Sequence, residues 1–223
     1  MDAEKTVPAV QHSPAAIAGK GARTRDRLME IAEQSILEKG FGATSIDELI
    51  AEAGITKSGF FYHFKDKNAL ALALLERHIA RDDEILDDLF ARARELAEDP
   101  LQGFLVGLKL FAEMLADLPT GHPGCIVATY CYQERLFDRE VCALNRQAVL
   151  NWRVRFRTTL DEIARLYPPR DDVDLDALAD AVSTVIEGGI VMSKALHEPG
   201  VLPQQVLLFR SYIKLLFSPA PQG

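Results

Sequence analysis

The chain has 223 residues, of which 48% are hydrophobic and 26% charged, and its net charge is -8 at pH 7. This is the composition of a folded protein with a buried core, and no run of about 18 uncharged apolar residues offers a membrane span. The first twenty residues lack the apolar stretch of a secretory signal, so we expect a flexible leader over residues 1–21, a cytoplasmic protein and no membrane partner. Three cysteines argue against a disulfide framework, and no cysteine and histidine spacing suggests zinc, so we expect no cofactor.

Apolar residues recur at helical spacing along most of the chain, and no segment alternates as a half-buried strand does. The class predicted is therefore all-α, with about nine helices. Capping residues, glycines and prolines set their expected limits. In chain order the helices are expected over residues 24–39, 46–53, 57–64, 67–97, 101–118, 124–136, 139–166, 175–197 and 202–217.

Two of the short helices form a recognisable pair. Ser45 followed by Glu48 is a capping box, Gly54 ends that helix in a tight turn, and Thr56 caps the next helix. Two short helices joined by a turn with glycine have the geometry that places a recognition helix in the major groove of DNA. The sequence therefore predicts a helix-turn-helix unit. Phe60 and Phe64, at helical spacing, are expected in its core.

The charge distribution agrees with DNA binding by one part of the chain only. Residues 20–67 contain as many bases as acids, so the rest of the chain carries the net charge of -8. The bases gather at residues 20–27 and 57–67, which suits one DNA site on an acidic body. Lysines are also commonly plain solvated charges, and the arginines at 23–27 either solvate their helix or form a basic arm. The residues expected to contact DNA through base edges, phosphates or helix starts are Thr44, Ser45, Lys57, Ser58, Gly59, Tyr62, His63, Lys65 and Lys67.

The stretch FGATSIDELIAEAGITKSGFFYHFKDKNAL, residues 41–70, resembles the DNA-binding head of the tetracycline-repressor (TetR) family. A weaker similarity lies in residues 187–196 and near residue 217. The resemblance implies a three-helix DNA-binding domain at residues 22–67 and a ligand-binding and dimerisation domain at 68–218. Its implied partners are a double-stranded DNA operator, a second copy of the chain and a small-molecule effector. One departure is Phe61, where many members have a tyrosine that contacts phosphate.

The resemblance implies a transcriptional regulator, most simply a repressor that binds inverted half-sites as a homodimer and is released by its ligand. An activator, or a regulator that needs a co-repressor, has the same fold and stays open. An all-helical enzyme is the rival from another class. The sequence has no GxSxG, HExxH or phosphate-loop motif, and its histidines are scattered, so we expect no catalysis.

The helical body offers an apolar lining with a few hydroxyls and thiols, from which we expect a neutral or weakly polar effector. The expected lining is Phe104, Leu108, Phe111, Met114, Cys125, Thr129, Tyr130, Trp152 and Phe156. Cys125 or Cys131 could react with an electrophile or oxidant, but buried inert thiols are the commoner case.

The last two helices carry more apolar residues than one packing face needs, which predicts a four-helix dimer interface. The alternative is that they pack only inside the monomer. The expected interface is Leu178, Val182, Val185, Ile186, Gly189, Phe209, Ile213 and Leu216.

Overall fold

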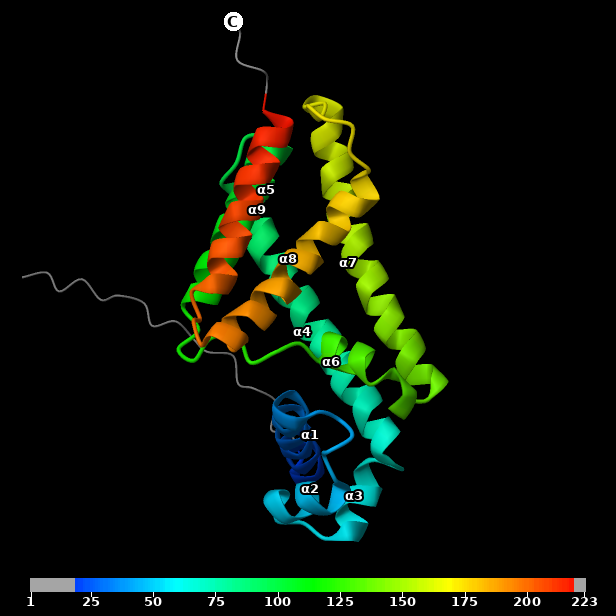
Figure 1. Ribbon diagram of the computed structural model, residues 1–223. Coiled ribbons are helices and arrows are strands. Elements are labelled where there is room, and N and C mark those ends of the chain that lie inside the picture. The colour runs from blue at the N-terminus through cyan, green and yellow to red at the C-terminus, as the bar shows by residue number, and fades with distance from the viewer. Residues whose placement is uncertain (1–18, 219–223) are drawn as a thin grey trace, which may run out of the picture.

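The structure is a computed structural model, and it describes residues 19–218. All regular elements in this range are helices, which confirms the all-α class (Figure 1). Nine α-helices are described there: α1 (Lys20–Lys39), α2 (Ile46–Ala53), α3 (Lys57–His63), α4 (Lys67–Glu95), α5 (Pro100–Ala116), α6 (Ile126–Tyr132), α7 (Arg139–Leu166), α8 (Leu175–Leu196) and α9 (Val201–Phe217), with a 3-10 turn, η1 (Glu134–Leu136), after α6.

Two helix limits differ from expectation by four residues. Helix α1 begins at Lys20, four residues early, because its exposed first turns carry no apolar pattern that could reveal them. The predicted leader therefore ends in helix, and its residues 1–18 lie outside the described range. Helix α6 ends at Tyr132 instead of residue 136, because Gln133 leaves the helix and its side chain accepts a hydrogen bond from Gly42 N at 3.0 Å.

The capping signals of the head fold as the sequence predicts. Ser45 accepts a hydrogen bond from Glu48 N and the Glu48 carboxylate accepts one from Ser45 N, which completes the capping box. Gly54 has φ of 66° in the left-handed region, where other residues are strained. The Thr56 side chain accepts a hydrogen bond from Gly59 N. These contacts fix the angle between α2 and α3.

Replacing Ser45 by alanine is expected to lower the free energy of unfolding by about 1 kcal/mol, because the box loses its acceptor. Urea denaturation followed by helical circular dichroism measures the change. Thr158→Ala is the matched control, since that exposed hydroxyl only bonds Val154 O of its own helix and its loss should stay within about 0.5 kcal/mol. Equal effects of the two changes would contradict a capping role for Ser45.

Helices α1, α2 and α3 form the head, and α4 runs from the head into the body (Figure 1). Phe60 and Phe64 are buried, as predicted for the core of the head. The 29 residues of α4 span about 43 Å, so one helix reaches both parts. The head also packs on α6, which follows from contacts between α1 and α6.

In the body, α5 packs against α4 and α9, and α8 packs against α7 and α9. Glycines let two pairs of these helices, α4 with α5 and α8 with α9, approach closely. A Cβ at Gly107 would lie 2.3 Å from the Phe90 ring, and one at Gly189 would lie 2.7 Å from Leu202 Cδ1. Within residues 19–218, no helix has the length and apolar character needed to cross a membrane.

Candidate DNA-binding face and effector cavity

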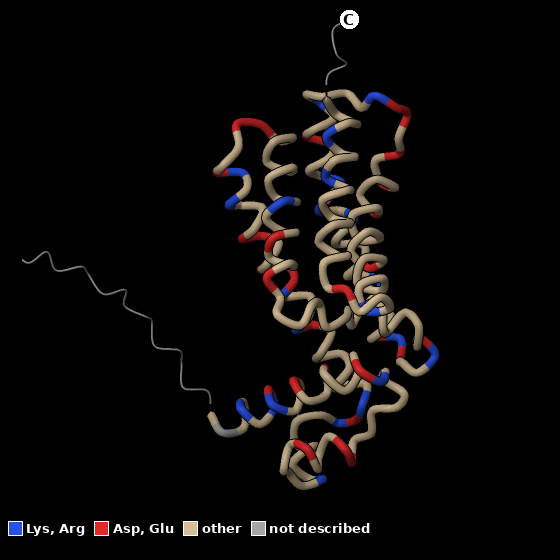
Figure 2. Tube along the Cα trace, turned by 60° about the vertical axis from the view of Figure 1, so that its left-hand side comes forward, with Lys and Arg blue, Asp and Glu red and all other residues tan. Residues whose placement is uncertain are grey.

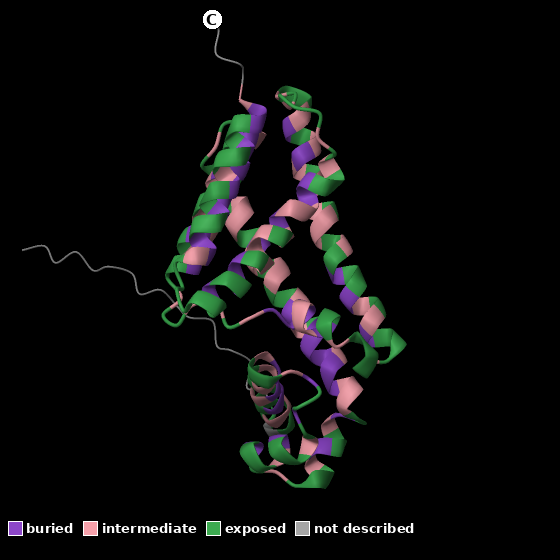
Figure 3. Ribbon diagram, in the orientation of Figure 1, coloured by how far each residue is buried: buried purple, intermediate pink, exposed green. Residues whose placement is uncertain are grey.

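Helix α3 exposes Lys57, Ser58 and Tyr62 to solvent and buries Phe60 in the head. The Lys57 side chain is 70% exposed and Tyr62 is 81% exposed, whereas Phe60 is fully buried. Ser58 and Lys65 are also exposed, so the structure brings several predicted contact residues together around α3 (Figure 3). The Lys57 ammonium lies 3.9 Å from the Asp47 carboxylate, a loose surface pair that leaves it free to meet a phosphate.

The other residues around α3 have mixed exposure. Ser45 is exposed, with its hydroxyl oxygen used as the α2 cap. Gly59 and His63 are half-buried. The Gly59 position leaves space only for ordinary contact, since a Cβ there would lie 3.4 Å from Thr56 Oγ1. The Phe61 ring is partly exposed and cannot donate a hydrogen bond, so polar contacts depend on its neighbours.

Two residues predicted to contact DNA, Thr44 and Lys67, use their side chains inside the head instead. Thr44 is buried, its hydroxyl donates to Gly40 O at 3.0 Å, and it also contacts the Ser35 hydroxyl. The Lys67 ammonium donates to Phe41 O and lies 4.1 Å from the centroid of the Phe41 ring, and burial lowers its pKa. Both side chains hold the loop before α2 in place instead of facing outward.

The head carries charges of both signs. Figure 2 shows Lys and Arg next to Asp and Glu along the head helices. The acids include the Glu48 carboxylate, whose pKa the hydrogen bond from Lys39 lowers, so it is held ionised. The exposed bases around α3 are therefore expected to act on DNA at short range. The head does not form one broad positive surface.

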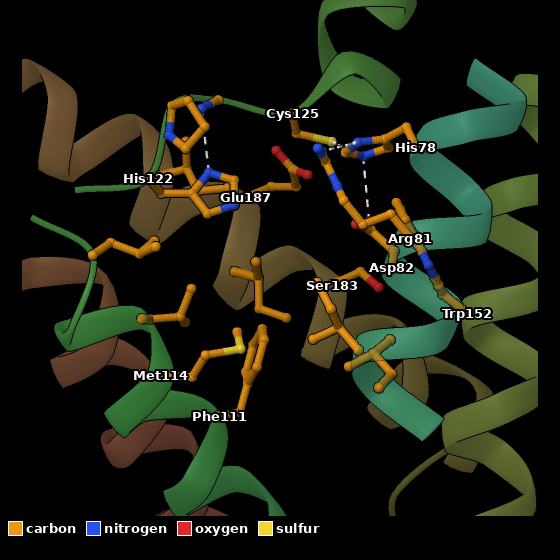
Figure 4. A pocket seen from close by; sticks show the side chains of 18 of the residues that line it. His78, Arg81, Asp82, Phe111, Met114, His122, Cys125, Trp152, Ser183 and Glu187 are labelled. Atoms are coloured by element: carbon orange, nitrogen blue, oxygen red, sulfur yellow. Dashed lines mark hydrogen bonds and ion pairs between the residues drawn. The ribbon is translucent and has the colours of Figure 1, made fainter. Parts of the chain in front are cut away.

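The body contains a cavity of about 300 Å³ between α4, α5, α7, α8 and the loop before α6, a volume at the lower end for small-molecule sites. Its lining is apolar at one end, where Phe111 and Met114 lie, and polar at the other (Figure 4). The lining residues are His78, Arg81, Asp82, Ile85, Leu86, Phe111, Met114, Leu115, Leu118, His122, Pro123, Gly124, Cys125, Trp152, Phe156, Ser183, Ile186, Glu187 and Ile190.

The polar end is a connected network. Arg81 Nη2 donates to His78 Nδ1 at 3.3 Å, and His78 Nε2 lies 3.3 Å from Asp82 Oδ2. Burial lowers the pKa of His78 to about 4, so the ring is neutral at pH 7 and carries its proton on Nε2, facing Asp82. Burial raises the pKa of Asp82 to about 6 and also raises that of Glu187, and it lowers the pKa of His122 to about 4.

Of the predicted ligand contacts, the cavity lining contains Phe111, Met114, Cys125, Trp152 and Phe156. The other four are wrong because they are packed elsewhere. Phe104 stacks on Phe90, and Leu108 is buried in the core. The Thr129 hydroxyl donates to Cys125 O, and the Tyr130 hydroxyl donates to Ala71 O.

Sequence reasoning missed the charged end of the cavity. The lining includes Arg81, Asp82 and Glu187, which corrects the expectation of few charged positions. One signal was available in α4, where His78 and Asp82 interrupt an inward stripe of leucines at i, i+4 spacing. Polar residues at core positions of an amphipathic helix are a common sign of a binding site.

An ion-pair cluster joins this cavity to the head. Glu33 of α1 accepts hydrogen bonds from Arg77 Nη2 at 2.6 Å and from Arg81 Nη2 at 3.1 Å. The Glu33 side chain is largely buried, so the pairs are better shielded from water than surface pairs. Arg81 therefore belongs both to the cavity lining and to the contact between α4 and α1.

The cysteines differ in exposure. Cys125 is buried, its Sγ lies 3.9 Å from His78 Nε2, and burial together with Glu187 raises its pKa well above the usual range. Cys131 is exposed and accepts a hydrogen bond from Asn145 Nδ2. Since the thiolate is the reactive form, these features describe an inert thiol at Cys125.

Iodoacetamide at pH 8 is accordingly expected to alkylate Cys131 in the folded protein and to leave Cys125 unmodified until the chain is unfolded in urea. Peptide mass spectrometry over time measures both rates. Cys125 alkylated as fast as Cys131 would contradict the burial of its thiol and would revive an electrophile sensor at this position.

Most of the predicted dimer residues are packed inside the single chain and do not face outward. Leu178, Val182, Phe209, Ile213 and Leu216 are buried inside the single chain, and Gly189 packs against Leu202. Val185 packs against the same core, while Ile186 lines the cavity. The opposite face of α8 and α9 exposes large apolar side chains instead: Val191, Met192, Leu196, Leu207, Leu208, Tyr212 and Leu215.

A helix-turn-helix head on a helical body with an internal cavity defines a DNA-binding transcriptional regulator. Residues 28–74 match the family model of bacterial regulatory proteins, tetR family. The chain is 25% identical over 209 residues to the transcriptional regulator AcuR of Cereibacter sphaeroides, which covers 91% of this chain and 92% of that one. It is 36% identical over 66 residues to the repressor NemR of Escherichia coli K12, or 30% of this chain and 33% of NemR.

Solved structures of TetR-family regulators have the same fold. A TetR-family regulator from Agrobacterium tumefaciens superposes with a TM-score of 0.72 at 16% identity, over 89% of this chain and 100% of that one. The head of this chain therefore matches the TetR family, and its overall fold is that of TetR-family regulators.

Proposed function

We propose that this regulator is a repressor that binds an inverted-repeat operator as a homodimer and leaves it when a small molecule fills the cavity. The observation that carries the proposal is that α4 lines the cavity and is ion-paired to the head through the same residue, Arg81. The division into a DNA-binding domain at 22–67 and a ligand-binding and dimerisation domain at 68–218 is part of this proposal.

The relatives support the repressor assignment. NemR is named a repressor and is similar to this chain over the head. AcuR, similar over nearly the whole chain, is named a transcriptional regulator, which leaves the sign of regulation open. We place the protein's action in the cytoplasm, where operator DNA lies, and we propose that the cavity binds its ligand without converting it.

DNA contact is assigned to Lys57, Ser58, Tyr62 and Lys65, and their exposure supports this assignment. Ser45, Gly59 and His63 are proposed to lie at the edge of the contact. A recognition helix of this kind reads base edges with its first residues and phosphates with those that follow. Lys57 and Ser58 are therefore proposed for bases, and Tyr62 and Lys65 for phosphates.

Ligand release follows from the two roles of Arg81. A ligand that enters the polar end of the cavity displaces or reorients Arg81, which shares Glu33 with Arg77. The contact between α4 and α1 then loosens, and the head turns relative to the body. The size of the effect on DNA affinity is limited by the difference in ligand affinity between the two arrangements.

Dimerisation is assigned to the exposed apolar face of α8 and α9. Leu208, Tyr212 and Leu215 recur at helical spacing on α9, and Gly188 on α8 has open space around its Cβ position. A contiguous apolar face of this kind marks an interaction surface. A two-fold axis through it would present two α3 helices to one duplex.

Selection of bound duplexes from random DNA, followed by anisotropy titration of the enriched duplex, tests the proposal. Two inverted half-sites about 34–36 Å apart are expected, occupied by one dimer. A compound that fills the cavity should lower this affinity. A compound that raises it would overturn the repressor assignment in favour of a co-repressor-dependent regulator.

A further inference from the structure

The charge of the cavity's polar end selects among effectors, and the inference that follows rests on the proposed effector site. The charged residues of the lining are Arg81, Asp82 and Glu187, so carboxylates exceed bases. The two histidines of the lining are neutral at pH 7. Acidic groups therefore outnumber bases at the polar end of the cavity.

Both carboxylates have neutral partners. His78 Nε2 faces Asp82 Oδ2 at 3.3 Å, and the thiol of Cys125 interacts with Glu187. Among the residues that the structure describes, no arginine or lysine nitrogen lies within 4.0 Å of either carboxylate. Neither carboxylate therefore forms an ion pair with an arginine or lysine, and Arg81 acts on Asp82 only from a longer distance.

The bases nearby are committed elsewhere. Arg81 is paired with Glu33 at 3.1 Å and donates to His78, so its charge serves the contact with the head. Lys194 of α8 lies against Gly124 and acts on His122, and it is not part of the lining. An anionic ligand would meet one base in the lining, Arg81, against two carboxylates, Asp82 and Glu187.

The remainder of the lining suits an apolar group. Phe111 and Met114 lie opposite Glu187 and His122 (Figure 4), and Trp152 and Phe156 are also part of the lining. Aromatic rings also attract cations through their faces. The cavity thus has a negative end and an apolar, partly aromatic end.

We propose that the effector is a small amphiphilic monocation, an amine whose ammonium group lies between Asp82 and Glu187 and whose apolar part lies against Phe111 and Met114. The ammonium supplies both carboxylates with an ion pair, which no described arginine or lysine gives them. It also gives the cavity a means of acting on Arg81, since a cation beside Asp82 repels the guanidinium next to it.

The test uses three compounds of one shape: 4-phenylbutylammonium, 4-phenylbutan-1-ol and 4-phenylbutyrate. Trp152 is the single tryptophan of the chain and lines the cavity, so its fluorescence reports binding without background. The amine is expected to bind about tenfold more tightly than the alcohol and more tightly still than the carboxylate.

Glu187→Gln and Asp82→Asn are each expected to weaken amine binding about tenfold and to change alcohol binding less than about threefold. Glu84→Gln, an exposed carboxylate of α4 outside the lining, is the matched control and should bind the amine as the unaltered chain does. If Asp82→Asn disturbs folding through His78, Glu187→Gln still decides the question.

Alcohol or carboxylate binding as tight as that of the amine would overturn the inference, as would equal weakening of all three compounds in the variants or no binding of any of them. Operator affinity, measured on the same preparations without compound, reports separately on the proposed function. Intact operator binding with no amine preference would reject the cationic effector alone.

Discussion

Replacing Lys57 and Tyr62 together by alanine is expected to lower the affinity for the selected operator by about 100-fold, because a base contact and a phosphate contact are both removed. Both side chains project from α3 into solvent, so the melting temperature should hardly change. The dependence of binding on salt should also become shallower, since fewer DNA counterions are released. Anisotropy titrations at several salt concentrations measure both effects.

The chain provides matched controls for this variant. Tyr132, at the end of α6, is 85% exposed, and Lys109 of α5 is exposed as well. The Tyr132→Ala, Lys109→Ala variant removes the same two residue types away from α3 and should bind the operator as the unaltered chain does. A similar loss in both double variants, or none in either, would reject α3 as the recognition helix.

Replacing Leu208 and Leu215 by arginine is expected to convert the dimer to a monomer and to lower operator affinity by at least about 100-fold. Each side chain is 65% exposed on α9, and two charges there would face two more in the partner copy. A monomer loses the high effective concentration that the linked second head provides. Light scattering after size exclusion measures the mass, and anisotropy measures the affinity.

Val154→Arg is the control, because Val154 is 64% exposed on α7 and is not part of the exposed apolar face of α8 and α9. It should remain a dimer with unchanged affinity. A dimer that survives both leucine changes would reject the α8 and α9 face as the interface, whatever its effect on DNA.

The sequence predicts the head well because its signals are local. A capping box at Ser45, a left-handed Gly54 and apolar residues at helical spacing such as Phe60 each act within a few residues of chain. The buried positions of a helix and its capping residue can therefore be predicted from the sequence without knowing the fold. Thr44 and Lys67 were misjudged since their partners, Ser35 and Phe41, come from other segments.

The body is harder because periodicity shows that a helix has an apolar face but not which neighbour covers it. Helix α9 carries apolar residues on two faces, and Phe209 packs inside while Leu208, one residue before it, is exposed. The cavity likewise joins α4 to α8, bringing Asp82 near Glu187 across a long stretch of sequence. Only the tertiary structure shows that these two carboxylates share one space.

Selection of bound duplexes from random DNA is the most direct test of the central claim, that this chain is a dimeric DNA-binding regulator acting through α3. The account predicts an enriched inverted repeat whose half-sites lie about one helical turn apart, with binding lost in the Lys57→Ala, Tyr62→Ala variant. No enriched sequence, or an enriched sequence that the variant binds equally well, would contradict it.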